Sequence, residues 1–427
     1  MLLLMLGTLA QAEDPVNVRF RMMMRPSVFV NPDFNSDTTA DNYWEVQQSI
    51  RMIATGKWDG VVVRMALNDG RVWGSQESIS LSKEINTALY EGYLQVGTPD
   101  NKSAWLRIGR QEIVLYDSRH FHHGGWNIHG RTFDAIRYHR ENEKFSYDLT
   151  GMVWKQSNTY DTTCTDADPD DGIDDCADFT AETIRSNGEV VLMANGEAKI
   201  SDALVVQPYL ISLHQDSTVD NPTRDRLVVG PSLRLEGKPN ENLYYSLDGS
   251  YQFGRATDDI AHQAWMAAAR MEYKKDNFGG SLWYEENSGD SDATDDVDNN
   301  FEPYYGAFHK FRGLADKVGP INSRDFGAGT SFKLQKNLTA KVDLHYFQLS
   351  NPEGTWYSFN RKPIGTAPVG NDDATIGQEI DVLVTYKPLK GVKFNYGYSF
   401  FRPDGVGTEI AGADPTHFGY VWMIVNK

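Results

Sequence analysis

The stretch Gln378–Arg402, QEIDVLVTYKPLKGVKFNYGYSFFR, decides the fold of this chain. On both sides of the turn Pro388-Leu389-Lys390, apolar and polar residues alternate with a period of two. That period is typical of a β-strand whose two faces meet different surroundings. Each segment has ten to twelve residues, about twice the usual strand length in a soluble protein. This length matches a tilted strand that crosses a bilayer.

Segments of this kind recur along the chain, and we count about eighteen of them. The links between them alternate strictly between short turns and long, polar segments. The longest links are 25–43, 112–131, 155–187, 286–323 and 350–377. Outer-membrane barrels have this wiring, with short periplasmic turns and long extracellular loops. The sequence therefore predicts an all-β fold, a transmembrane antiparallel up-and-down β-barrel of about 18 strands.

Negative charge gathers in two of the long links. The chain has 41 Lys and Arg against 59 Asp and Glu, a formal net charge of −18. Residues 161–182 contain nine acids, residues 285–302 contain eight, and neither segment has a Lys or Arg. The predicted strands are therefore nearly neutral. Because a lipid-facing charge costs about 2 to 4 kcal/mol near the bilayer midplane, this distribution suits a wall embedded in lipid.

The N-terminal residues 1–12, MLLLMLGTLAQA, form an apolar stretch that ends in a small-x-small pattern. This pattern predicts cleavage by signal peptidase before Glu13 and export of the chain, although the usual basic region is missing. The alternative is a short buried strand, which the following Glu13-Asp14-Pro15 disfavours because proline interrupts strand pairing. We therefore expect 1–12 to be a signal-peptide remnant and 13–427 to be a single outer-membrane barrel.

The composition excludes several other classes of protein. Aromatic residues make up 12% of the chain, which disfavours a disordered protein. After residue 12 no apolar run reaches the length of about 18 residues that a membrane-spanning helix needs. The acidic balance disfavours nucleic acid as a partner, because nucleic-acid-binding domains present a basic face.

Three stretches resemble the alginate-export family of outer-membrane barrels. They are LRIGRQEIVLYDSRHFHHGGWNIHGRTFDAIRYHR from Leu106, FEPYYGAFHKFRGLAD from Phe301 and IGQEIDVLVTYKPLKGVKFNYGYSFFRPDG from Ile376. The resemblance covers most of the chain and implies an eighteen-stranded barrel, in agreement with the independent count. It is less specific for the solute: the family includes an exporter of alginate, a polyuronate, but the resemblance extends to carriers of other solutes.

If the apolar face of each strand meets lipid, the opposite face lines the lumen. The basic residues that this alternation assigns to the lumen are Arg19, Arg21, Arg51, Arg64, Arg107, Arg234, Arg270, Lys341 and Lys393. Rings of Arg and Lys in a low-dielectric pore attract anions, and guanidinium binds carboxylate in a bidentate way. The alternative is that these side chains pair with acids on the same strands, such as Asp248, Glu272 and Asp343, and hold loops in the lumen.

The link 112–131 is rich in Gly and His, and we expect it to fold inward and constrict the pore. Its candidate solute-contacting residues, together with one at the end of the preceding strand, are Arg110, Arg119, Trp126 and Arg131. The histidines His120, His122, His123 and His129 suggest a metal site as a minor alternative to hydrogen bonds with the wall.

The link 155–187 holds both cysteines of the chain, Cys164 and Cys176. Because both fall in one exported loop, we expect them to form a disulfide. Between them, Asp166, Asp168, Asp170 and Asp174 resemble a calcium loop, although the usual terminal Glu is absent. The alternative is a solvated acidic loop bridged by divalent ions to lipopolysaccharide. Calcium is thus the one candidate cofactor, and none is required.

These patterns predict a porin or exporter channel in the outer membrane of a Gram-negative bacterium, which passes hydrophilic, anionic solutes by diffusion. Polyuronate such as alginate is one candidate. Two alternatives stay open: a barrel that encloses an electron carrier, and an outer-membrane enzyme, for which the sequence has neither G-x-S-x-G nor H-E-x-x-H. The expected partners are membrane lipid, lipopolysaccharide and a candidate periplasmic protein, and the pattern fits a monomer or a homo-oligomer.

Overall fold

The computed structural model describes residues 16–37, 42–74, 87–98, 103–155, 159–166, 176–184, 188–215, 225–290, 292 and 294–427. Side chains are described in these ranges except at 154–155, 159–166 and 176–184. The predicted signal-peptide remnant 1–12 lies outside the described residues. No helix in the described ranges is long and apolar enough to cross a bilayer.

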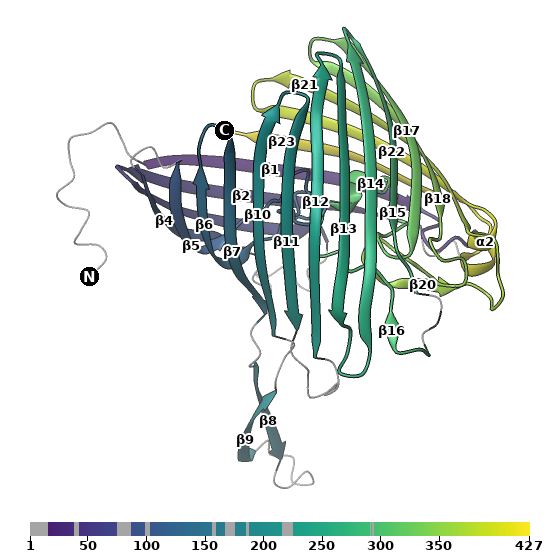
Figure 1. Ribbon diagram of the computed structural model, residues 1–427, viewed down its shortest axis with the longest axis horizontal. Coiled ribbons are helices and arrows are strands. Elements are labelled where there is room, and N and C mark those ends of the chain that lie inside the picture. The colour runs from purple at the N-terminus through teal and green to yellow at the C-terminus, as the bar shows by residue number, and fades with distance from the viewer. Residues whose placement is uncertain are drawn as a thin grey trace.

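Eighteen of the strands formed by the described residues close into one antiparallel barrel (Figure 1). They are β1 (Val16–Val30), β2 (Tyr43–Trp58), β3 (Val61–Val72), β4 (Thr87–Gly97), β5 (Ala104–Gln111), β6 (Phe133–Glu141), β7 (Phe145–Lys155), β10 (Glu189–Ser201), β11 (Leu204–Gln215), β12 (Arg226–Asn240), β13 (Leu243–Arg255), β14 (Ala261–Lys275), β15 (Phe278–Asn287), β17 (Ser323–Gln335), β18 (Leu338–Gln348), β21 (Thr375–Leu389), β22 (Val392–Pro403) and β23 (Thr416–Asn426). The ring closes because β1 pairs with both β2 and β23. The predicted fold is confirmed.

Several predicted links contain more structure than expected. Strand β1 continues to Val30, and the first link therefore begins at Asn31 rather than at residue 25. The link 155–187 contains the two-stranded hairpin of β8 (Thr159–Asp166) and β9 (Cys176–Ile184). The other short elements between barrel strands are β16 (Val297–Asp298), α1 (Phe308–Phe311), β19 (Thr355–Tyr357), β20 (Pro363–Thr366) and α2 (Val406–Ala411).

The two ends of the barrel differ. Turns of only a few residues join β2 to β3, β12 to β13, β17 to β18 and β21 to β22 at one end. The C-terminal residue lies at this end, where Lys427 and Phe20 exchange two backbone hydrogen bonds of 2.9 Å. The long connections lie at the opposite end. In outer-membrane barrels the short turns face the periplasm, and we expect the same orientation here.

The outer face of the barrel carries the apolar half of each strand. Leu344 and Leu282, in the middle of their strands, are 49% and 55% exposed. Aromatic pairs flank this band on neighbouring strands: Phe278 and Phe332 lie near the short turns, with ring centroids 5.6 Å apart, and Tyr284 and Phe326 lie nearer the opposite end, 4.8 Å apart. An apolar band between two aromatic girdles is the expected outer surface of a transmembrane barrel.

The inner face is less uniformly polar than the alternation predicts. On β6, β7, β10 and β11 the inward residues include Phe133, Met152, Val191 and Ile211, all buried. They form an apolar cluster with residues of the link 112–131, among them Phe121. Part of the inner wall thus serves as a docking surface for a chain segment that folds into the barrel.

We predict that Leu344→Arg destabilises the barrel by about 2 to 4 kcal/mol, because the new charge meets acyl chains at mid-depth. Unfolding by urea in lipid vesicles, followed by tryptophan fluorescence, measures this loss. The matched control is Ser331→Arg on the neighbouring strand β17, where the inward side of the wall meets water. Equal destabilisation by both variants contradicts the assignment of faces.

Candidate functional site

Two segments fold into the lumen and pair with each other. The first is the connection 112–132, and the second is residues 301–316, which belong to the connection between β15 and β17. The backbone of Phe121 bridges that of Tyr305. The N–H of His122 donates to the carbonyl of Tyr305 at 3.0 Å, and the N–H of Tyr305 donates to the carbonyl of His120 at 2.8 Å. We call this pair the inner constriction. The inward folding predicted for 112–131 is present, whereas 301–316 was expected in an outer loop.

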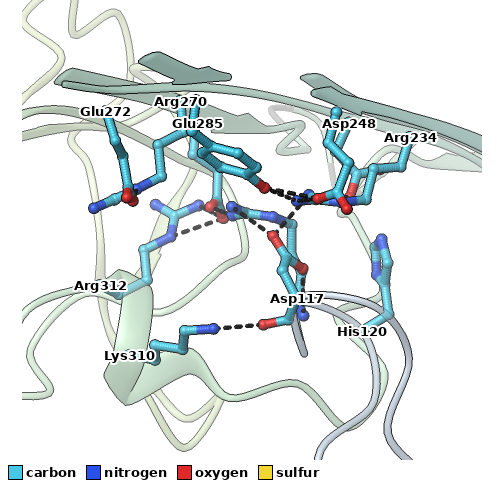
Figure 2. A network of polar contacts seen from close by, with 12 residues as sticks. Asp117, His120, Arg234, Asp248, Arg270, Glu272, Glu285, Lys310 and Arg312 are labelled. Atoms are coloured by element: carbon cyan, nitrogen blue, oxygen red, sulfur yellow. Dashed lines mark hydrogen bonds and ion pairs between the residues drawn. The ribbon is translucent and has the colours of Figure 1, made fainter. Parts of the chain in front are cut away.

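Ion pairs fasten the inner constriction to the barrel wall (Figure 2). Asp117, from the first segment, lies 2.8 Å from Arg234 on β12. Arg234 is only 1% exposed, and it also lies 3.6 Å from Asp248 on β13. The ammonium of Lys310, from α1, donates to the backbone carbonyl of Asp117 at 2.7 Å. The network therefore joins both segments and two barrel strands.

Glu285 on β15 is the second anchor of this network. Its carboxylate accepts hydrogen bonds from Arg312 at 2.7 and 3.0 Å and forms an ion pair with Arg119. Arg312 is 1% exposed, and the guanidinium of Arg119 lies 4.3 Å from the ring centroid of Phe311. One carboxylate thus compensates two buried guanidinium groups from different segments. Removing a partner from such a buried pair typically costs about 3 to 5 kcal/mol.

Burial and this network of ion pairs shift the pKa values of titratable groups in the inner constriction. Burial lowers the pKa of His120 to about 3, and the nearby Arg119 adds to the effect. His120 is therefore neutral at neutral pH, and its Nε2 lies 2.7 Å from the hydroxyl of Tyr209. Burial opposes ionisation of Asp117, but Arg119 and Arg234 outweigh it and hold the pKa of Asp117 below its usual value. Asp117 therefore stays charged.

Between the inner constriction and the wall lies a cavity of about 400 Å³, which we call the chamber. Its walls carry aromatic residues, among them Trp126, Trp283, Tyr420 and Trp422. They also carry both signs of charge: the basic groups are Arg234, Arg270, Lys310 and Lys341, and the acidic groups are Asp117, Glu272, Asp343 and Asp381. The chamber thus combines charged groups with aromatic walls, and its size is typical for small-molecule sites.

Among the predicted solute-contacting residues, Trp126 borders the chamber and contacts both a barrel strand and α1. Its ring is stacked on His309, with 3.7 Å between ring centroids, and the guanidinium of Arg25 lies 3.4 Å from its centroid. Arg25 also donates to the carbonyl of Trp126 at 2.9 Å. Trp126 is thus clamped between β1 and α1, at the border of the inner constriction and the chamber.

Most predicted lumenal cations lie on the inner wall but are neutralised there by carboxylates. Arg64 pairs with Glu91 at 2.6 Å, and Arg51 lies 3.5 Å from Glu112 and 3.3 Å from the ring centroid of Tyr90. Arg270 pairs with Glu272 and Lys341 with Asp343, each at 2.5 Å. Arg131 donates to the carbonyl of Tyr305 inside the inner constriction. The alternative of ion pairs within the lumen therefore describes most of these residues.

The prediction that Arg110 lines the pore is wrong. Arg110 shares the face of Leu106 and Ile108, which are 40% and 49% exposed on the outer side of β5. It pairs with Asp134 on β6 at 2.7 Å. The strand alternation continues through Arg110, whereas the prediction grouped this residue with the loop that follows.

A smaller group of predicted cations has no carboxylate within ion-pair distance among the described residues. Arg107 bonds instead to the amide oxygen of Gln95, at 2.6 and 3.0 Å. Arg21 and Lys393 border a cavity of about 1190 Å³ at the short-turn end, which we call the periplasmic mouth. Arg19 lies on the same face of β1 as Arg21, two residues nearer that end, and is exposed.

Of the two predicted cation sites, the histidine site is not formed by the described side chains, and the calcium site is not tested by them. No three His, Cys, Asp or Glu residues converge as metal ligands among those side chains, and His120 bonds Tyr209 instead. Of the predicted calcium ligands, Asp168, Asp170 and Asp174 lie outside the described residues, and Asp166 is described only as the backbone end of β8. Cys164 and Cys176 likewise belong to β8 and β9 without described side chains. Calcium and the disulfide stay predictions.

Sequence reasoning missed the residues that hold the inner constriction. Asp117, Glu285, Lys310 and Arg312 received no role in it, although the stretch from Phe301 that contains two of them carried part of the family resemblance. The missed aromatic residues are Trp283, Tyr420 and Trp422. Their inward positions follow from strand alternation, and this signal was sufficient to find them.

Fold and lumen together define an outer-membrane β-barrel channel. The family described as Alginate export matches residues 15–413, and the chain belongs to this family of Gram-negative outer-membrane proteins. No curated protein matches the chain. Among solved structures, OccAB2 of Acinetobacter baumannii is 10% identical, with a TM-score of 0.61 and coverage of 97% of this chain and 99% of that one.

Two structures from Pseudomonas aeruginosa are similar in the same way. The outer membrane protein OprD is 12% identical, with a TM-score of 0.57 and coverage of 96% of this chain and 94% of that one. OccK11 (OpdR) is 11% identical, with a TM-score of 0.58 and coverage of 96% and 95%. At this level of identity the likeness concerns the fold.

We predict that Glu285→Gln loosens the inner constriction, because Arg119 and Arg312 lose their shared counter-charge. The expected result in planar bilayers is a larger single-channel conductance with more frequent fluctuations. Glu91→Gln is the matched control, since Glu91 is also a buried carboxylate but pairs with Arg64 on the wall, outside the network of Arg119, Arg234 and Arg312. Unchanged conductance of Glu285→Gln contradicts the anchoring role.

Proposed function

We propose that this channel passes hydrophilic anions across the outer membrane by diffusion. The name of the family, Alginate export, makes a polyuronate one candidate solute. The observation that carries the proposal is the charge of the periplasmic mouth. Its cavity is bordered by Arg21, Lys336, Lys387, Lys390 and Lys393 and by no carboxylate of the described chain.

The basic sector extends along the strands that border the mouth. Between residues 326 and 342, and again between 382 and 403, the chain has no Asp or Glu. Elsewhere on the rim, the other short turns carry lysines as well, but these are accompanied by acids such as Asp59, Glu143 and Glu241. The positive charge is therefore concentrated on one side of the opening. A low-dielectric wall focuses this field and raises the local concentration of anions.

The lumenal arginines support the proposal less than expected, since most are paired with carboxylates. These arginines stabilise the fold of the lumen instead, through ion pairs such as that of Arg234 with Asp117. The narrow lumen also favours a channel over a sheath around an electron carrier. The inner constriction leaves a chamber of about 400 Å³, which suits a small solute or an extended chain and not a folded protein.

We predict that the triple variant Lys387→Glu, Lys390→Glu, Lys393→Glu lowers the ratio of chloride to potassium permeability at least about two-fold, because it reverses the focused field. The reversal potential in a KCl gradient across a planar bilayer measures this ratio.

The control triple variant is Lys144→Glu, Lys238→Glu, Lys275→Glu, which makes the same charge change at exposed positions elsewhere on the rim. It should shift the reversal potential far less. Cation preference of the unaltered channel, or equal shifts from both triple variants, refutes anion selection at the periplasmic mouth.

A further inference from the structure

Arg110 and Asp134 form an ion pair on the outer surface of the barrel, on the neighbouring strands β5 and β6. The two residues are direct partners in the strand register, and Asp134 shares the outward face of Ile136, which is 56% exposed. Nε and Nη2 of Arg110 donate to the two carboxylate oxygens of Asp134, at 2.9 and 2.7 Å. The two side chains are still 42% and 57% exposed. The pair is therefore satisfied within the chain, yet much of its surface meets whatever surrounds the barrel.

This ion pair lies low in the wall, because β5 and β6 are the shortest of the eighteen barrel strands, with eight and nine residues. Arg110 is six residues from Ala104, where β5 begins at the short-turn end. At about 3.3 Å per residue and a tilt of about 45°, Arg110 lies about 14 Å above that end, near the middle of an apolar band about 25 Å tall.

Two other outward-facing arginines lie at the far border of this band. Arg71 is ten residues from the short-turn end of β3, and Arg324 is eleven residues from that end of β17, which corresponds to about 23 and 26 Å on the same geometry. A charged side chain on the lipid face destabilises a barrel most at mid-depth and little near the borders of the band. Arg110 and Asp134 thus lie where acyl chains are the least favourable neighbour.

The ion pair is complementary to a second copy of itself. A two-fold axis along the membrane normal keeps every residue at its depth and brings the same surface of both copies face to face. Because Arg110 and Asp134 lie side by side, this rotation places Arg110 opposite Asp134 of the partner subunit, and Asp134 opposite the partner's Arg110. Nη1 of Arg110 has no hydrogen-bond partner among the described residues, and it is available for this contact.

The wall beside the pair allows a close approach. Gly92 on β4 is the register partner of Arg110, and Gly151 on β7 is the register partner of Ile136. Apolar surfaces gain little when they leave lipid for each other, so association inside a bilayer depends on close packing and on polar contacts. The glycines favour the first of these requirements, and the ion pair meets the second.

We propose that the outer wall around Arg110 and Asp134 is the docking surface for a second copy of this chain, in a dimer whose two pores run parallel. The four charges then form one network that is shielded from acyl chains. The contact uses only the lipid-facing side of the wall, and it therefore does not depend on which solute the channel passes.

The test exchanges the two charges in the double variant Arg110→Asp, Asp134→Arg, which keeps an ion pair within each copy. Donor-labelled and acceptor-labelled copies of the chain are reconstituted in lipid vesicles, and fluorescence energy transfer between them measures association. Two unaltered copies should associate, and so should two exchanged copies. An unaltered copy should bind an exchanged copy at least about ten-fold more weakly, because like charges then face each other.

The matched control is the double variant Glu286→Arg, Arg324→Glu, which exchanges another ion pair between neighbouring strands of the wall. Arg324 is on β17, nine strands from β5 round the ring and thus on the opposite side of the barrel. These control copies should associate with unaltered copies without loss. Absence of energy transfer between unaltered copies at every protein-to-lipid ratio overturns the proposal and means that lipid alone covers the pair. Equal transfer between unaltered and exchanged copies of the Arg110 and Asp134 pair overturns it as well.

Discussion

The whole structure depends on one constraint: backbone N–H and C=O groups inside a bilayer must all be hydrogen-bonded within the protein. A sheet meets this constraint only when it closes, and here β1 closes it by pairing with both β2 and β23. Closure gives every strand one face toward lipid and one toward the lumen. Because side chains alternate with a period of two, a slip of one residue would exchange the two faces.

Closure leaves an interior too wide for the wall side chains to fill, and the chain fills it with its own connections. The inner constriction is held by polar groups where it meets β12 and β15, and by apolar packing where Phe121 contacts the buried wall of β6. Desolvated charges are costly unless each has a partner. The pairing of Asp117 with Arg234, and of Glu285 with two arginines, satisfies this requirement. The main role of these lumenal arginines is thus to stabilise the structure.

Local pattern predicted the strands well because period and length are local properties. The predicted segment 391–402 corresponds to β22 at Val392–Pro403, whereas β1 runs six residues further than its predicted end at residue 24, past Pro26. The alternation along β5 also indicates that Arg110 points outward. The prediction instead assigned Arg110 to the pore because it lies next to the link 112–131. The partners inside the lumen could not be predicted in the same way. Arg234 and Asp117 are 117 residues apart in sequence, and only the inward folding of one connection brings them together.

The separation of charge along the barrel axis has a consequence for electrical behaviour. Carboxylates gather in the long connections at one end, around residues 285–302, and ammonium groups gather at the other, around the periplasmic mouth. The molecule therefore carries a permanent dipole along the barrel axis. Such a fixed field makes ionic current unequal for opposite voltages of the same size, as in a diode. A fixed field does no net work over a cycle, and it therefore cannot by itself set the direction of net flux.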